Sequence, residues 1–310
     1  MEVTFSNPFY LWALLVVPVL IVLYFVSLKY SKALTVKFAN FVALSRVAGT
    51  VGESSNFGVL FVRILALVFI ILSISGMTFW YYGESANKDY VLVIDSSASM
   101  SLGENLMPNR LESVKIAASN FIDGLPISSK VGVISFSGTS FVEQPLTIEK
   151  NLAKEAIENI QINTVGGTDI ENAIITGANI LIPSKKAKVI IILTDGRSNI
   201  GVSEETAISY AIANHIIVHT IGVGSQSESE FGDLILGLDE ESLKNIAELT
   251  LGNYYFVEND EDLKGVYRGL VENPALGNNP IDLAFYLLLA ALILLLFDWM
   301  LGATIYRKIP

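Results

Sequence analysis

The residues with the clearest chemistry are oxygen donors that follow two apolar segments. The segment DYVLVID ends at Asp95, and hydroxyls follow at alternate positions, Ser97 and Ser99. The segment AKVIIILTDG runs into Asp195. Carboxylate and hydroxyl oxygens are the ligands that hard divalent cations such as Mg²⁺ prefer. The two segments therefore carry a candidate metal site, provided that the fold brings their ends together.

A further oxygen donor comes from a third loop. The stretch NTVGGTDI places Thr168 after two glycines and at the start of a predicted helix, 168–182. We expect all three loops at the carboxyl edge of one sheet, with Asp95 at the solvent edge and one coordination position free for an acidic group of a partner. The predicted metal ligands are Asp95, Ser97, Ser99, Thr168 and Asp195.

Each of these residues also has an ordinary structural explanation. Asp95 could be a turn residue, and the two serines could cap a helix or lie in a loop. Thr168 precedes Glu171 by three positions, which is the spacing of a capping box. Asp195-Gly196 is a common turn dipeptide. The combination of all five in this order favours the metal site over five separate coincidences.

Strand and helix patterns alternate around these loops. Residues 130–137 and 140–147 form a predicted hairpin, and Pro145 suits an edge strand. The alternation predicts an α/β class, with a doubly wound, mostly parallel, Rossmann-like sheet and helices on both faces. An insertion at 224–238 interrupts it. The other predicted strands are 89–95, 187–196, 216–224 and 253–259, and the predicted helices are 110–125, 148–160, 168–182, 203–216, 239–250 and 260–273.

Three apolar runs predict transmembrane helices, because each has about the 20 residues that a bilayer requires. They are 8–28, 58–82 and 283–306, in a chain of 310 residues with 52% hydrophobic residues. Glu2 precedes the first run without any Lys or Arg, so we expect a retained helix and not a cleaved signal peptide. Arg63 and Asp298 lie inside the second and third runs, where they either pair or each reach separately towards the inner surface.

The distribution of basic residues predicts the topology. Four Lys or Arg lie between the first two runs, and two more follow the third. The positive-inside rule then places the large middle segment outside the cytoplasm. The predicted organisation is a membrane module at 1–82 with a cytoplasmic loop at 29–57, an extracytoplasmic domain at 83–280, and a third helix with a cytoplasmic tail at 281–310.

The charge and the cysteine content exclude several functions. Residues 83–280 contain 13 Lys or Arg and 27 Asp or Glu, a net charge of −14, which argues against nucleic acid as a partner. The chain has no cysteine, so thiol chemistry is excluded. A hydrolase or phosphotransferase is disfavoured, because Ser97 stands where a second aspartate would be expected, no Walker motif occurs, and His215 and His219 lie in predicted structural positions. No catalytic residues are predicted.

The site motif resembles a known metal site. Asp95-Ser96-Ser97-Ala98-Ser99, together with Thr168 and Thr194-Asp195-Gly196, resembles the metal-ion-dependent adhesion site (MIDAS) of von Willebrand factor type A (VWA) domains. The likeness spans 89–273. It implies Mg²⁺, with Mn²⁺ or Ca²⁺ as alternatives. It also implies that the two serines and Thr168 bind the metal directly, and that the aspartates bind it directly or through water.

Residues 5–44 resemble the N-terminal module of the Bat-type aerotolerance proteins, and LDEESLKNIAELTLGNYYFVEN resembles the end of their A domain. This resemblance implies a multi-pass cell-membrane protein that binds proteins in envelope assembly or stress tolerance. The implied partners are a ligand with an acidic residue, a MoxR-type ATPase reached through 29–57, and other VWA membrane proteins. A surface adhesin with an extracellular ligand is the alternative.

Overall fold

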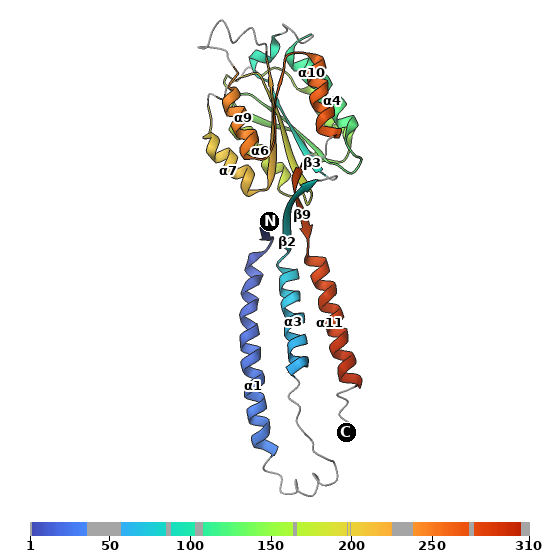
Figure 1. Ribbon diagram of the computed structural model, residues 1–310. Coiled ribbons are helices and arrows are strands. Elements are labelled where there is room, and N and C mark those ends of the chain that lie inside the picture. Colours follow the sequence, from blue (N-terminus) through green and yellow to red (C-terminus); the bar gives the residue numbers. More distant parts are fainter. Residues whose placement is uncertain are drawn as a thin grey trace. The chain divides into compact units, whose positions relative to one another are not determined.

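The computed structural model describes residues 2–35, 57–84, 88–102, 108–163, 166–196, 198, 200–224, 238–272 and 276–304. The chain divides into two compact units (Figure 1). We call the first the membrane unit, which comprises Met1–Trp80 and Ile281–Pro310, and the second the sheet unit, which comprises Tyr81–Pro280. The predicted insertion at 224–238 lies almost wholly outside the described residues.

The strands are β1 (Glu2–Phe5), β2 (Met77–Glu84), β3 (Lys88–Asp95), β4 (Val131–Phe136), β5 (Ser140–Thr147), β6 (Ala187–Thr194), β7 (Ile216–Val223), β8 (Tyr254–Val257) and β9 (Leu276–Asp282). The helices are η1 (Pro8–Leu15), α1 (Val16–Thr35), α3 (Phe57–Ile74), η2 (Ala98–Ser101), α4 (Arg110–Gly124), α5 (Lys150–Asn159), α6 (Ile170–Leu181), α7 (Glu204–Ala213), α9 (Glu240–Leu249), α10 (Asp260–Glu272) and α11 (Ala284–Thr304).

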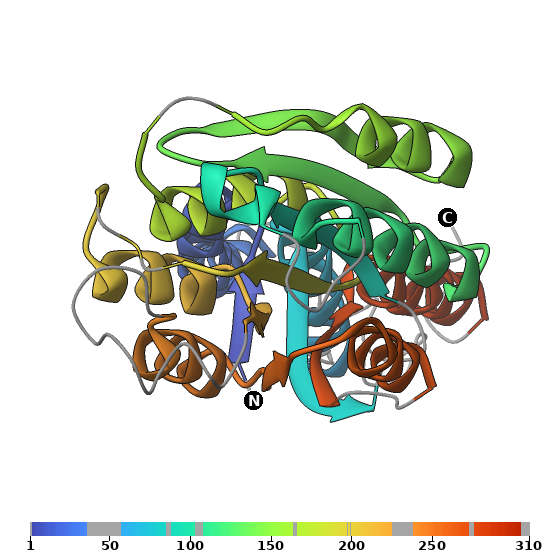
Figure 2. The same ribbon diagram turned by 90° about the horizontal axis from the view of Figure 1, so that it is seen from above.

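The sheet unit has the predicted α/β architecture. Its strands follow the order β5-β4-β3-β6-β7-β8, with helices on both faces (Figure 2). All neighbouring pairs are parallel except β4 and β5, which form the antiparallel hairpin expected from the sequence. Pro145 lies in β5, the edge strand, where a missing backbone N–H costs no ladder hydrogen bond.

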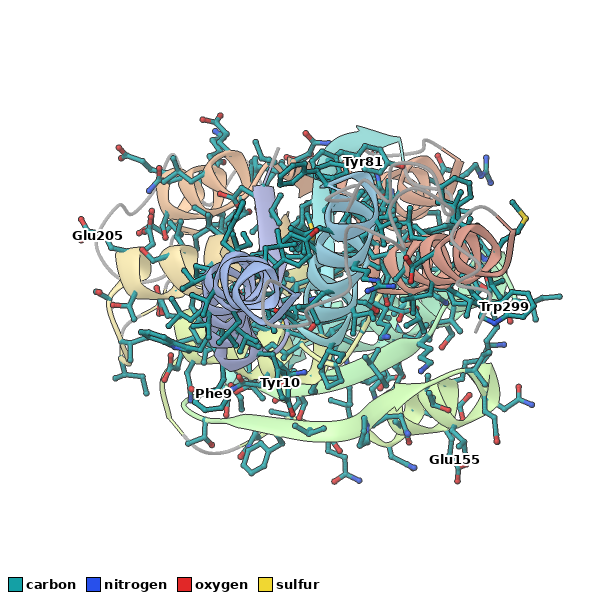
Figure 3. The ribbon with its side chains drawn as sticks, turned by 90° about the horizontal axis from the view of Figure 1, so that it is seen from below. Phe9, Tyr10, Tyr81, Glu155, Glu205 and Trp299 are labelled. Carbon is teal, nitrogen blue, oxygen red and sulfur yellow. The ribbon has the colours of Figure 1, made fainter. Side chains whose placement is uncertain are left out.

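Both faces of this sheet are buried, which explains why its central strands are continuously apolar. In β3, Leu92 and Ile94 pack on one side with α4, α5 and α10. Val91 and Val93 pack on the other side with α6, α7 and α9. Each fully buried side chain of this size stabilises the fold by about 1.5–3 kcal/mol. Glu155 of α5 and Glu205 of α7 point away from the sheet (Figure 3).

The membrane unit contains three helices in the described ranges that are long and apolar enough to cross a bilayer: Pro8–Leu28, Phe57–Ile74 and Ala284–Leu301. Helix α3 packs against α11 and contacts α1 (Figure 1). Trp299 projects outward from α11 (Figure 3) and is 72% exposed, as expected of a side chain that faces lipid.

The second helix is shorter than the sequence predicted. Its apolar run was expected to continue helically over 58–82, but α3 ends at Ile74 and the aromatic residues that follow form β2, which pairs with β1. Gly76 has φ +68°, a conformation that ends a helix and favours glycine. The stretch TFWYY after it consists of good strand formers, so hydropathy alone overestimated the helix.

Arg63 and Asp298 form an ion pair inside the membrane unit. The Arg63 Nε donates to both carboxylate oxygens of Asp298, at 3.2 and 3.0 Å. This confirms pairing over the alternative in which each side chain reaches separately towards the surface. The pair links α3 to α11 and neutralises two charges that the bilayer interior disfavours.

Candidate metal centre

Two carboxylates meet at the carboxyl edge of the sheet. Asp95 is the last residue of β3, and Asp195 directly follows β6. The two strands are parallel neighbours, with Ile94 in register with Leu193. Parallel strands in register end at the same edge, so the fold brings the two predicted carboxylates together.

The two serines lie in the turn after β3, and Ser99 contacts the second aspartate. The Ser97 and Ser99 hydroxyl oxygens are 3.0 Å apart. The Ser99 hydroxyl donates to Asp195 Oδ1 at 2.7 Å. Ser97 directly precedes η2, yet its side chain makes no capping hydrogen bond. The capping explanation therefore fails for Ser97.

Thr168 lies in the loop before α6, beside the Asp195 loop. The side chain that caps α6 belongs to Asp169, whose Oδ1 accepts from the Asn172 N–H at 2.9 Å. Thr168 is therefore not the capping residue. A Cβ placed on Gly196 would lie 3.6 Å from the Thr168 hydroxyl oxygen, so this hydroxyl faces the backbone directly after Asp195. All five predicted residues thus lie at one edge.

Asp95 is fully buried, which corrects the expectation that it lies at the solvent edge. Its Oδ1 accepts from the Ser97 N–H at 2.8 Å, and its Oδ2 accepts from the Thr194 hydroxyl at 2.6 Å. Burial, followed by the charge of Asp195, raises the pKa of Asp95 to about 6. Burial also raises the pKa of Asp195, although hydrogen bonds from Ser99 and Arg110 oppose the shift.

Arg110 is the main site neighbour that the sequence did not reveal. It opens α4, and its Nη1 donates to Asp195 Oδ2 at 3.0 Å, with both side chains almost completely buried. Nothing in the local sequence connects Arg110 with a strand end 85 positions away. Among the described residues, this guanidinium pairs with Asp195, while the neighbouring carboxylate of Asp95 forms no ion pair. When both acids are ionised, the two carboxylates and the Arg110 guanidinium have a net negative charge, which a further cation can neutralise.

The loop after Asp195 is held against the start of α6. The Ser198 hydroxyl donates to the Glu171 carboxylate and to the Thr168 carbonyl. Gly201 has φ +116°, and a Cβ there would lie 2.2 Å from Asp169 Oδ1, so only glycine permits this approach. These contacts hold Thr168 and Asp195 in a common position, a role that sequence reasoning did not assign to Ser198, Glu171 or Gly201.

The donor set fits a hard cation. All five side chains offer oxygen, as Mg²⁺ and Ca²⁺ sites require. Within the described ranges, no three His, Cys, Asp or Glu side chains are grouped so that they could hold a metal ion. A cation at this edge would therefore depend on the hydroxyl groups as well as on the two carboxylates.

The two histidines of the chain are not part of this arrangement. His215 directly precedes β7 and so lies at the opposite, amino edge of the sheet. His219 is buried within β7, and its Nδ1 accepts from the Asn253 N–H at 3.0 Å. Burial, followed by the charge of Lys88, lowers the pKa of His219 to about 4, so it is neutral at pH 7.

Comparisons with known proteins bear on the family and the fold. A model of the von Willebrand factor type A domain matches residues 90–197, and a model of the aerotolerance regulator N-terminal region matches residues 1–76. A UPF0353 protein from Nocardia farcinica is 28% identical over 265 residues, which cover 76% of this chain and 78% of the relative.

Two solved structures are similar to a large part of this chain. BatB from Bacteroides thetaiotaomicron has a TM-score of 0.51 and 28% identity, over 59% of this chain and 96% of BatB. Proximal thread matrix protein 1 from the mussel byssus, solved with a zinc-occupied MIDAS motif, has a TM-score of 0.53 and 20% identity, over 71% of this chain and 53% of that protein. The latter likeness concerns the fold alone.

Proposed function

The chain is a von Willebrand factor type A membrane protein of the Bat type, and from this premise we propose that it binds a partner protein through a divalent cation at the carboxyl edge of the sheet. The observation that carries this proposal is the convergence of oxygen donors from three loops: Asp95, Ser97, Ser99, Thr168 and Asp195.

The proposed ligands have different roles. Ser97, Ser99 and Thr168 bind the cation directly, and Asp95 and Asp195 bind it directly or through water. Mg²⁺ is the proposed metal because all donors are hard oxygens, and Mn²⁺ and Ca²⁺ are the alternatives. When bound, the cation supplies a position for one carboxylate of the partner. The contact between Ser99 and Asp195 supports this assignment, because it already orients two of the proposed ligands towards each other.

Binding accounts for this site better than catalysis does. A nucleophilic hydroxyl needs an adjacent general base, usually a histidine. The two histidines lie at the amino edge and inside β7, away from Ser97 and Ser99. Among the described residues, Asp95 accepts from the Ser97 N–H, and Asp195, which accepts from the Ser99 hydroxyl, is held in an ion pair by Arg110. The domain is therefore proposed as a binding module without enzymatic activity.

The proposed cellular setting follows from the membrane module. The match to the aerotolerance regulator N-terminal region supports a role in envelope assembly or stress tolerance. We place the domain 83–280 outside the cytoplasm, between the membrane segments 1–82 and 281–310. Loop 29–57, most of which lies outside the described residues, is the proposed contact for a MoxR-type ATPase, and other VWA membrane proteins are proposed as further partners.

Photo-crosslinking in intact membranes tests the proposed function. A photoreactive side chain replaces exposed Ala98, next to the two serines. Membranes are irradiated with Mg²⁺ or with EDTA, and the captured proteins and crosslinked residues are identified by mass spectrometry. We expect a crosslink beside an acidic residue of the partner that is lost with EDTA and in Asp95→Ala. A crosslink that survives both treatments would contradict the proposal, as would the absence of any captured protein.

A further inference from the structure

A second candidate binding site lies between α4 and α10, on one face of the sheet unit. The two helices are neighbours (Figure 2) and enclose a groove of about 360 Å³. We call it the α4–α10 groove. Its apolar side chains include Phe121, Tyr267 and Val271, and its polar ones are Asn120, Lys264 and Arg268. The groove is distinct from the metal edge, because its α4 residues lie about two to four turns beyond Arg110.

The charge of the groove is opposite to that of its surroundings. The sheet unit carries a net charge of −14, yet Lys264 and Arg268 both line this one groove. Neither forms an ion pair with any residue in the described part of the chain. Other lysines of the unit do have acidic partners, among them Lys154 with Asp123 and Lys244 with Glu240. The groove therefore presents two uncompensated cations to a ligand.

The walls of the groove combine these cations with a rigid apolar surface. The rings of Phe121 and Tyr267 are 5.0 Å apart at an interplanar angle of 40°. Both rings belong to the hydrophobic core, so they are fixed from behind. The Tyr267 hydroxyl is enclosed and has no hydrogen-bond partner among the described residues. A ligand that suits these walls has an apolar side chain next to acidic groups.

The spacing of the cations selects the shape of the ligand. Lys264 and Arg268 are four residues apart on α10, which separates them by about 6 Å along the helix axis. In an extended peptide, side chains on the same side recur every second residue, at about 6.6 Å. The groove runs from Ala117 to Gly124 on α4, about 10 Å at the helical rise. That length accommodates about three extended residues.

We propose that the α4–α10 groove binds an extended acidic segment of a partner protein, in which two carboxylates flank one apolar residue. The carboxylates pair with Lys264 and Arg268 on α10, and the apolar side chain between them points to the opposite side of the extended peptide, where it packs against Phe121 on α4. Charge complementarity is the basis for choosing this occupant. Within the described part of an otherwise acidic unit, the groove presents two cations that have no ion-pair partner beside an apolar wall.

Fluorescence anisotropy on the full chain in nanodiscs of neutral lipid tests the proposal. The probes are fluorescein-labelled heptapeptides with two glutamates that are adjacent, separated by one valine, or separated by three residues. We expect the peptide with one intervening valine to bind tightest. The double variant Lys264→Gln, Arg268→Gln should weaken it at least tenfold. The matched control Lys130→Gln, Lys244→Gln removes two exposed lysines elsewhere and should leave binding unchanged.

A third variant separates the shape of the groove from its charge. Asn120→Trp fills the groove without a charge change and should also abolish binding. Binding should persist in EDTA and in Asp95→Ala, which distinguishes this site from the proposed metal centre. The proposal is overturned if no peptide binds, if all three spacings bind equally, or if the control weakens binding as much as the double variant. Binding to vesicles of anionic lipid in place of the peptides would also overturn it.

Discussion

The two ends of strand β3 carry the same residue in opposite settings. Asp89 lies at its start and Asp95 at its end, and both are almost completely buried. Asp89 accepts from the Lys130 N–H at 2.9 Å, from the Ser184 hydroxyl at 2.7 Å and from the Lys186 ammonium at 3.2 Å. A cation and two further donors therefore satisfy the carboxylate of Asp89 at the amino edge.

Within the described part of the chain, the hydrogen-bond donors to Asp95 are neutral. Its partners are the Ser97 N–H and the Thr194 hydroxyl, and the nearby Asp195 adds a repulsive charge. A buried carboxylate without a countercharge is costly, and such groups concentrate at functional sites. The comparison shows that burial alone does not distinguish a structural acid from a functional one. The distinction lies in whether the surrounding protein supplies the opposite charge.

The largest expected effect is the loss of the metal in Asp95→Asn. This change keeps the size of the side chain and removes one of the two carboxylates that offset the cation. Since loss of supporting groups alone costs 10–100-fold in metal affinity, we expect a loss of about 100-fold or more. Isothermal titration calorimetry with Mg²⁺ measures it. Asp89→Asn is the matched control, and an equal loss in both variants would remove the functional difference between the two ends.

The same two substitutions should affect the stability of the metal-free protein differently. Asp89→Asn removes the buried charge that pairs with Lys186, whose ammonium then keeps a neutral acceptor, the Ser128 carbonyl, so we expect the metal-free protein to lose about 2 kcal/mol of unfolding free energy. Asp95→Asn relieves the repulsion with Asp195 and should leave that free energy unchanged or higher. Thermal unfolding in detergent with EDTA compares them. A strongly destabilised Asp95→Asn would indicate that Asp95 is a structural acid.

The pH should affect metal binding through the same carboxylate. The pKa of Asp95 is raised to about 6 in the metal-free protein, whereas an unfolded aspartate has a pKa of 3.8. Its ionisation therefore destabilises the metal-free fold as the pH rises from about 4 to 6, and protonation competes with metal below about 6. We expect Mg²⁺ affinity to fall about tenfold per pH unit there. Calorimetry between pH 5 and 7 tests this, and a constant affinity would contradict it.

The smallest expected effect on stability concerns a third aspartate, Asp298. Asp298 is paired with Arg63 in the membrane unit, so it resembles Asp89 and not Asp95. A double-mutant cycle with Arg63→Leu and Asp298→Leu should give a coupling energy of about 1 kcal/mol. Unfolding of purified protein in detergent provides the four free energies. Additive effects of the two substitutions would mean that the pair contributes nothing to the association of α3 with α11.

Much of the fold can be predicted from local sequence patterns. Strands buried on both faces must be continuously apolar, and amphipathic helices must repeat at helical spacing, so the alternation predicted the parallel sheet and its antiparallel edge strand. The position of Asp95 and Asp195 at strand ends predicted that they meet. The same local signal failed after Ile74, because hydropathy does not distinguish an apolar helix from the aromatic strand β2.

The sequence by itself determined which oxygen donors lie at the carboxyl edge. Strand direction and register decide at which edge of the sheet the residues that follow a strand are placed. Only the tertiary structure decided which charges accompany them. Arg110 reaches Asp195 from the start of α4, Lys186 reaches Asp89 from the loop before β6, and Lys264 has no ion-pair partner among the described residues. Each of these charge arrangements depends on how the helices and loops pack against the sheet. That packing is set by the whole core and not by any local stretch of chain.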